Sequence, residues 1–191
     1  KRDCRTDSGI ATERFVSRSS QENVVSFKGK QMNIKVYRIR DSAKLPVRAH
    51  ETDAGMDLFY CPDNVTSFQV PCVIRADGSY ALSPGASCLL PTGIKVEVPE
   101  DHMLEIKNKS GIASKRQLLV GACVVDAGYD GEVYVNLHNT SAETQTIEPG
   151  QKIAQAVLTP IVTCGVEEVF EDLLNTDSAR ATGGFGSTGL L

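Results

Sequence analysis

Short runs in which apolar and polar residues alternate recur along the chain from Met32 onward. The first, MNIKVYRIR, has the period-two pattern of a strand with one buried face. Later runs of strand length follow, separated by turn residues such as Pro-Gly, Asp-Gly and Thr-Gly. They are SFQVPCVI, SYALSPGASCLLPTGIKVEVPE, HMLEIKN, QLLVGACVV, GEVYVNLHN, AETQTIEPG and KIAQAVLTPIV. Runs of this length and spacing predict an antiparallel sandwich or jelly roll.

Helical patterning is scarce. The stretch SGIASKRQ, residues 110–117, fits one short helical turn, and Ser110 is placed to cap its N-terminus. VEEVFEDLL, residues 166–174, suits a strand and a short helix equally well. We therefore predict an all-β, jelly-roll-like antiparallel domain with one short helix.

The two ends of the chain differ in composition from its middle. Residues 1–31 are polar, mixed in charge and weakly periodic, which indicates an N-terminal extension that is disordered, processed or left over from expression. Residues 175–191 include the Gly-rich ARATGGFGSTGLL, which has too little apolar surface for a core and is expected to be a flexible arm in isolation. The compact domain is expected between them, at residues 32–174.

Composition and charge argue against several classes of protein. The 191 residues have a net charge of −4, which offers no basic face to nucleic acid. No run approaches the roughly 20 apolar residues that span a bilayer, and the start of the chain has no apolar segment typical of a secretory signal. We expect an intracellular protein, cytoplasmic or nuclear, with an organellar or viral origin left open.

Cysteine and histidine usage argues against a metal centre built from those residues. The six cysteines form no C-x-x-C pair, and the three histidines have no metal-ligand spacing. The cysteines are Cys4, Cys61, Cys72, Cys88, Cys123 and Cys164. Free and mostly buried thiols in a reducing compartment are favoured over disulfides.

Three stretches in the body of the chain suit phosphate or metal chemistry. DAGMDL, residues 53–58, is either a turn that enters a strand or a source of a carboxylate that helps to hold a hard cation such as Mg²⁺. KNKSGIASK, residues 107–115, combines a hydroxyl, backbone N–H groups and lysines, which suits a phosphate although it is no P-loop. EPGQKIAQAVL, residues 148–158, places Lys152 and Gln155 on a strand, where the glutamine either has a polar partner or faces outward.

Two further stretches suit catalysis and ligand binding: one contains a carboxylate, and the other is the C-terminal tail. GACVVDAGYDGEVYVNLHN, residues 121–139, predicts a hairpin with Asp126 at the end of its first strand. This carboxylate either opens the turn or, partly desolvated behind the apolar run, serves as a general base. In the tail, Arg180 can fork onto a phosphate, Ser187 can donate a hydrogen bond, and Phe185 can cover a flat base.

Taken in order, five segments resemble the motifs of a known family. AGMDL, KSGIAS, VVDAGYDGEV, GQKIAQAVL and RATGGFGSTG resemble the five motifs of the trimeric dUTPases (dUTP diphosphatases), over residues 32–191. The resemblance implies a jelly roll that assembles as a homotrimer with active sites at the subunit interfaces. It also implies that water attacks the α-phosphorus of dUTP to give dUMP and pyrophosphate, with Mg²⁺ on the triphosphate. Such an enzyme limits uracil incorporation into DNA and supplies dUMP for dTMP synthesis.

The resemblance implies roles for individual residues. Asp126 matches the general base that deprotonates the attacking water, and Asp57 matches the carboxylate that reaches magnesium through water. Tyr129 matches the aromatic that packs on the deoxyribose, while the backbone around Cys123 and Tyr134 matches the edge that binds uracil. Other substrate-binding positions are matched by Lys109, Ser110, Gly111, Gln155, Arg180 (for the γ-phosphate), Phe185 (over the uracil), Gly186 and Ser187. The tail is then a lid that closes over bound nucleotide.

Three positions depart from the family pattern. Lys109 and Lys152 stand where arginine is usual or frequent, so the charge is kept but the bidentate fork is lost. Asp130 stands where a basic residue is common, which inverts a local charge and is expected to remove an ion pair that steadies the hairpin or the tail. An active enzyme with altered kinetics is expected.

Two rival functions are less favoured. A dCTP deaminase has the same fold but places a glutamate in the strand after the hairpin, and VYVNLHN contains none. A non-catalytic, regulatory nucleotide-binding module has no need of Asp126, Tyr129, Arg180 and Phe185 together, yet all four are present.

Overall fold

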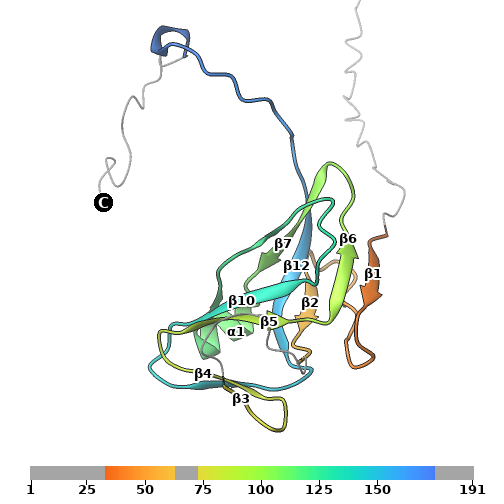
Figure 1. Cartoon of the computed structure of the whole chain (residues 1–191), viewed down its shortest axis with the longest axis vertical. Helices are drawn as coiled ribbons and strands as arrows, with labels where there is room; N and C mark the ends of the chain where they lie inside the picture. Colours follow the sequence, from red (N-terminus) through yellow and green to blue (C-terminus); the bar gives the residue numbers. More distant parts are fainter. Residues whose placement is uncertain (1–32, 63–72, 175–191) are drawn as a thin grey trace, which may run out of the picture. The chain divides into compact units, whose positions relative to one another are not determined.

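The structure, a computed structural model, describes residues 33–62 and 73–174, and this part of the chain consists mainly of antiparallel strands (Figure 1). In chain order the elements are β1 (Lys35–Arg38), β2 (Met56–Phe59), β3 (Val73–Ile74), β4 (Tyr80–Leu82), β5 (Ser87–Pro91), β6 (Ile94–Glu97), β7 (His102–Lys107), α1 (Ser110–Arg116), β8 (Leu118–Val120), β9 (Val124–Val125), β10 (Tyr134–Asn139), β11 (Gln145–Ile147), β12 (Lys152–Pro160) and the 3-10 turn η1 (Glu171–Leu173). The predicted all-β class with one short helix is confirmed. The division of the chain at residues 31 and 174 stays a prediction, because its outer parts lie outside the described residues.

The strands combine into four antiparallel sheets. One has four strands in the order β2-β12-β7-β9, and β1 pairs with β6 alone. The other two have three strands each, in the orders β5-β10-β8 and β11-β4-β3. Neighbouring strands are often distant in sequence, as where β12 lies between β2 and β7 (Figure 1). Long-range pairing of this kind brings the stretches around Asp57, Lys107, Asp126 and Gln155, which the sequence singled out for their chemistry, onto or next to the four-stranded sheet.

One hydrophobic core joins the sheets. Each sheet contributes side chains that are almost completely buried, among them Leu58 of β2, Leu82 of β4, Leu90 of β5, Ile94 of β6 and Leu137 of β10. Burial alternates along β10, as the period-two pattern of its sequence predicts. The strands therefore hold their positions mainly through the apolar face that each turns inward.

The predicted hairpin at residues 121–139 is only partly right. Strand β8 pairs with β10, but the chain leaves that sheet after Val120, and β9 pairs with β7 instead. At the branch point Gly121 N donates to Asn136 O (2.9 Å), and Ala122 N donates to the side-chain Oδ1 of Asn136 (3.2 Å) rather than to a strand carbonyl. The two arms consequently part, and residues 121–133 form a wide loop, called here the Asp126 loop.

Helix α1 begins differently from the prediction. Lys109 is the N-cap, with extended backbone angles, and Ser110 is the first helical residue, so the predicted Ser110 cap is wrong. The carbonyl of Lys109 already accepts hydrogen bonds from Ile112 N and Ala113 N, both at 2.9 Å, which places the start of the helix one residue earlier. The helix ends at Arg116, and its C-cap Gln117 has a left-handed φ of 53°.

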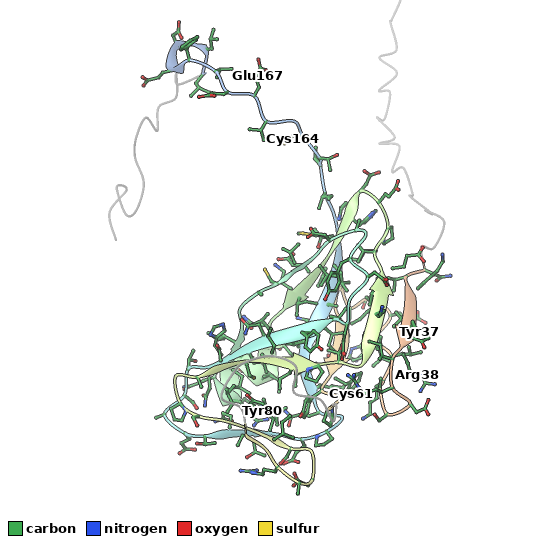
Figure 2. All side chains as sticks on the ribbon, in the orientation of Figure 1. Tyr37, Arg38, Cys61, Tyr80, Cys164 and Glu167 are labelled. Carbon is green, nitrogen blue, oxygen red and sulfur yellow. The ribbon has the colours of Figure 1, made fainter. Side chains whose placement is uncertain are left out.

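The segment after β12 is exposed along its whole described length. Residues 161–174 have no regular structure apart from η1, so the ambiguous VEEVFEDLL stretch is neither a strand nor an α-helix. Several of its large apolar side chains face solvent, including Val162 (93% exposed), Val166 (99%) and Phe170 (81%). Figure 2 shows Cys164 and Glu167 on this segment. The segment therefore leaves a large apolar surface uncovered in the single chain.

The cysteine prediction holds in one respect and fails in another. The four described cysteines are free thiols, as expected. Cys61 and Cys88 are buried, but Cys123 is only partly buried and Cys164 is exposed, so the expectation of mostly buried thiols holds for half of them. Among the described residues no helix is long and apolar enough to cross a membrane.

Strand β8 offers a matched test of the core. Leu118 is 1% exposed and its neighbour Leu119 is 38% exposed, on the opposite face of the strand. We expect Leu118→Ala to lower the free energy of unfolding by about 2–5 kcal/mol, because it leaves a cavity. Leu119→Ala should cost about 0.5–1 kcal/mol. Urea unfolding at one protein concentration measures both, and equal losses would contradict the assigned core face.

Candidate active site

The parted arms of the Asp126 loop line a cavity of about 310 Å³. Four residues predicted for the site meet there: Cys123, Asp126, Tyr129 and Tyr134. The other lining residues are Leu89, Ile106, Ala122, Val124, Val125, Glu132 and Val133. A small, mostly apolar hollow with a few polar groups at its edge suits a flat ring and an attached sugar.

The ring of Tyr129 folds back over its own loop. Its hydroxyl donates to the backbone carbonyl of Glu132 at 3.0 Å. A Cβ atom at Gly131 would overlap both the hydroxyl and the ring of Tyr129, so only glycine permits this position. Tyr129 is 48% exposed, which leaves one part of its ring open to a ligand in the cavity.

Asp126 lies at the turn of the loop. Its carbonyl accepts a hydrogen bond from Tyr129 N at 3.3 Å, so the residue does open a turn, which is one of its two predicted roles. Its side chain is exposed in the single chain, and the expected partial desolvation is therefore absent there. The reason is that β9 has only two residues, and the chain turns outward immediately after it.

A second cluster forms around Asp57 on β2. The Nζ atom of Lys109 donates to Asp57 Oδ1 at 2.7 Å, and the Nζ atom of Lys152 lies 2.7 Å from Oδ2. The second contact is a close ion pair rather than a well-aligned hydrogen bond, since Oδ2 has no partner of good hydrogen-bond geometry. Asp57 is 5% exposed, whereas both lysines are partly exposed. One buried carboxylate thus holds two ammonium groups side by side.

The electrostatics of Asp57 follow from these contacts. Burial alone would raise the pKa of its carboxyl, because the charged form loses hydration. The hydrogen bond from Lys109, the close contact of Lys152 and the charges of both lysines outweigh burial, and the pKa is lowered below its ordinary value of 3.8. Asp57 is therefore ionised at neutral pH.

Of the remaining predicted residues, the structure describes three and leaves four undescribed. Gln155 on β12 lies between Asp57 and Lys107 in the sheet, and its Nε2 donates to Asn108 O at 2.9 Å. Ser110 and Gly111 start helix α1 and are exposed. Arg180, Phe185, Gly186 and Ser187 lie outside the described residues.

The two clusters lie apart within one chain. Asp57 pairs with Gln155, which pairs with Lys107 at the end of β7. Asp126 follows Val125, which pairs with Leu104 near the start of β7. At about 3.3 Å per residue and about 4.8 Å per strand, four residues along β7 and three strand spacings separate the two carboxylates by roughly 20 Å. One phosphate cannot touch both.

A larger hollow of about 540 Å³ lies beside the Asp126 loop. It is lined by β1, β6 and Gly128–Asp130, and Tyr129 is the one predicted site residue among the described residues that line it. The Nζ atom of Lys95 donates there to Asp130 O (2.7 Å) and to Asp130 Oδ1 (3.2 Å). The inverted charge at Asp130 thus forms an ion pair with Lys95, and the loss of the ion pair that a basic residue would make here stays a prediction. We assign the smaller cavity to the nucleoside because it gathers four predicted residues.

The chain is similar in sequence to proteins of one known family. The family model described as dUTPase matches residues 74–189. The deoxyuridine 5'-triphosphate nucleotidohydrolase of Clostridium tetani is 37% identical over 161 residues, which cover 83% of this chain and 98% of the relative. The enzyme of the same name from Alkaliphilus metalliredigens is 39% identical over 160 residues, with the same coverage.

The chain belongs to the dUTPase family.

Solved structures of the family share the fold. A dUTPase of Staphylococcus bacteriophage 80alpha, solved with dUpNHpp, has a TM-score of 0.67 at 25% identity and covers 84% of this chain and 100% of its own. A dUTPase of phage phi11 of S. aureus, whose structure describes a structural Mg(II) ion, has a TM-score of 0.61 at 25% identity, with 73% and 99% covered. The predicted family and the predicted jelly-roll-like fold are confirmed.

Some residues around this dUTPase site were not predicted. The side chain of Glu132 binds Arg40, and the side chain of Asn136 holds the backbone of Ala122 and of Cys88 at the mouth of the cavity. The contact between Lys152 and Asp57 was also missed. These contacts join residues from distant parts of the chain, and the local pattern of a strand contains no signal for its partner.

The lowered pKa of Asp57 predicts a stability effect in acid. Its contribution should be complete above pH 3.8, the ordinary value, and should be lost as the pH falls through the lower folded-state value. The difference in unfolding free energy between the wild type and Asp57→Asn should therefore be constant near neutral pH and shrink below about pH 4. Urea unfolding at a series of pH values measures it. Asp41→Asn, at an exposed carboxylate, is the control, and a difference that grows in acid would refute the assignment.

Proposed function

We propose that the chain hydrolyses dUTP to dUMP and pyrophosphate, with Asp126 as the general base. The diphosphatase activity is that of the family to which the chain belongs. The observation that carries the residue assignment is the single cavity shared by Cys123, Asp126, Tyr129 and Tyr134. A dCTP deaminase is not favoured, since both relatives named above are deoxyuridine triphosphate nucleotidohydrolases.

The nucleoside enters the cavity between the parted arms of the Asp126 loop. The backbone around Cys123 and Tyr134 lies where the strands diverge, and its polar groups pair with the edge of the uracil. Tyr129 packs against the deoxyribose and leaves no room for a 2′-hydroxyl. The apolar walls exclude water from the base, which strengthens the hydrogen bonds between the backbone and the uracil edge.

Catalysis depends on a positioned water and on charge. Asp126 at the edge of the cavity accepts a proton from the water that attacks the α-phosphorus, and pyrophosphate leaves on the opposite side. Burial of Asp126 by a neighbouring subunit and by the nucleotide supplies the desolvation that the single chain lacks. Little covalent chemistry is required of the protein, because phosphoryl displacement depends mainly on placement and electrostatics.

The triphosphate binds at the cluster around Asp57. Lys109 and Lys152 supply positive charge, and Ser110, Gly111 and Gln155 supply hydrogen-bond donors nearby. In the C-terminal tail Arg180 binds the γ-phosphate, Phe185 covers the uracil, and Gly186 and Ser187 complete the lid. The cluster carries one more positive than negative charge, which favours an anionic ligand.

Magnesium fits this site only as a companion of the triphosphate. Within residues 33–62 and 73–174 no group of three His, Cys, Asp or Glu side chains is placed to hold a metal. Asp57 has an ammonium group against each oxygen, which opposes direct metal contact and leaves a contact through water. Bound Mg²⁺ would neutralise and orient the phosphates.

We infer that the active enzyme is a homotrimer with sites shared between subunits. The separation of roughly 20 Å between Asp57 and Asp126 supports this, because a single triphosphate is too short to reach both in one chain. The exposed apolar segment 161–174 supports it as well, since a neighbouring subunit would cover that surface.

The free thiols of the described cysteines favour a reducing compartment, cytoplasmic or nuclear.

Asp126→Asn tests the catalytic assignment. We expect rapid pyrophosphate release from dUTP alone, and not from dTTP, dCTP or UTP, by the wild type with Mg²⁺. The variant should lose activity by about 10²–10⁴-fold, because the amide cannot accept the proton. Calorimetric binding of dUpNHpp should persist in the variant. Full activity of Asp126→Asn, or ammonia release from dCTP by the wild type, would overturn the proposal.

Mixing two inactive variants tests the shared site. Asp57→Asn and Asp126→Asn should each be nearly inactive alone. Refolded together in equal amounts, they should regain about one quarter of wild-type activity. Each shared site then has an even chance of an intact Asp57 from one subunit and an even chance of an intact Asp126 from the other. If both carboxylates acted from one chain, no mixed assembly would contain an intact site. Each variant refolded alone is the control.

A further inference from the structure

A partly buried ion pair joins Arg40, which lies outside the five motifs, to Glu132 of the third motif and supports the Asp126 loop. Arg40 follows β1 and Glu132 lies near the end of the loop, 92 residues later. Their side chains are 22% and 10% exposed. Arg40 Nη1 donates to Glu132 Oε2 at 3.1 Å, and Arg40 Nη2 makes a second, closer bond to Oε1. This bidentate geometry is the strongest that an arginine and a carboxylate form.

Glu132 is held on several sides. Its Oε1 also accepts the backbone N–H of Gly93 at 2.7 Å, and its Oε2 lies 3.4 Å from the hydroxyl of Tyr134. Arg40 in turn donates to the carbonyl of Cys61 at 3.2 Å, and Figure 2 labels Cys61. Burial would lower the pKa of Arg40, but its hydrogen bonds to Glu132 and Cys61 outweigh burial and the pKa is raised. Arg40 therefore keeps its positive charge beside Glu132.

The backbone of Glu132 transmits this constraint to the cavity. Its carbonyl oxygen is the acceptor for the Tyr129 hydroxyl at 3.0 Å. The next residue, Val133, is fixed as well, since its N–H donates to Ile94 O at 2.9 Å and its carbonyl accepts from Thr92 Oγ1 at 2.5 Å. The carbonyl that anchors Tyr129 thus belongs to the most firmly bound part of the loop.

We propose that Arg40 and Glu132 are positioning residues that hold the Tyr129 ring where it selects deoxyribose over ribose. The inference rests on the proposed function, because it takes Tyr129 to be the residue that contacts the sugar. When the pair is broken, the Glu132 carbonyl shifts and the ring gains room to move away. A ribonucleotide then fits better, whereas the chemistry at Asp126 is altered less.

The test compares selectivity between dUTP and UTP in four variants. Glu132→Gln removes the charge of the carboxylate, and Arg40→Lys keeps the cation but loses the fork. The double variant Arg40→Met with Glu132→Leu removes both charges, so that no unpaired charge is left buried to unfold the chain. Lys35→Ala is the control, because it breaks an exposed ion pair with Glu97 between β6 and β1, the strand that precedes Arg40.

The expected readout is the ratio of kcat/KM for dUTP to kcat/KM for UTP. We expect this ratio to fall about tenfold in Glu132→Gln and in the double variant, mainly through a lower KM for UTP, and about threefold in Arg40→Lys. Lys35→Ala should keep the wild-type ratio. A merely structural role would lower the melting temperature and leave the ratio unchanged.

The outcomes separate this proposal from the proposed function. Wild-type selectivity in the double variant and in Arg40→Lys would overturn the positioning role, even if Glu132→Gln failed to fold. Absence of dUTP hydrolysis by the wild type would instead overturn the proposed function. Loss of selectivity in Lys35→Ala to the same extent would also overturn the proposal, since any disturbance of the β1–β6 sheet would then suffice.

Discussion

Strand β7 pairs with β12 on one side and with β9 on the other, and these two registers determine where the functional side chains lie. The β12 register brings Gln155 and Asp57 level with Lys107, at one end of β7. The β9 register leaves Asp126 near the other end of β7. A slip of one residue in either ladder would turn buried side chains to the opposite face, so the core enforces both registers. The distance between the two clusters is thus a property of the sheet, and the proposed sharing of the site between subunits rests on that distance.

The two ion clusters differ in charge balance, and this difference suits the separate roles that we propose for them. Around Asp57 a single carboxylate faces two ammonium groups, so the cluster keeps an unbalanced positive charge for an anion. Arg40 and Glu132 balance each other and satisfy their remaining groups with backbone atoms. A balanced pair of low exposure has little to offer a ligand, but it holds two distant segments in one geometry.

The sequence predicted the strands well because apolar alternation reports which face of a strand is buried, as along β10. The stretches that carry the chemistry were also visible, since turn residues and carboxylates stand out locally. The branching of the Asp126 loop was not predictable, because it depends on the Asn136 side chain replacing a strand carbonyl. Nor was the N-cap at Lys109, where backbone angles rather than residue preference decide the start of the helix. The contact between Arg40 and Glu132 leaves no local pattern at all.

The two lysines that depart from the family pattern are best understood together. An arginine fork takes both oxygens of a carboxylate at once, whereas an ammonium group makes a point contact. Here Lys109 takes one oxygen of Asp57 and Lys152 takes the other. A carboxylate shared in this way accommodates two cations, each on a flexible stem that can still turn toward a phosphate. Neither lysine therefore forms a bidentate pair with Asp57. Each keeps the positive charge of the arginine that it replaces, so the charge available for the proposed triphosphate is unchanged.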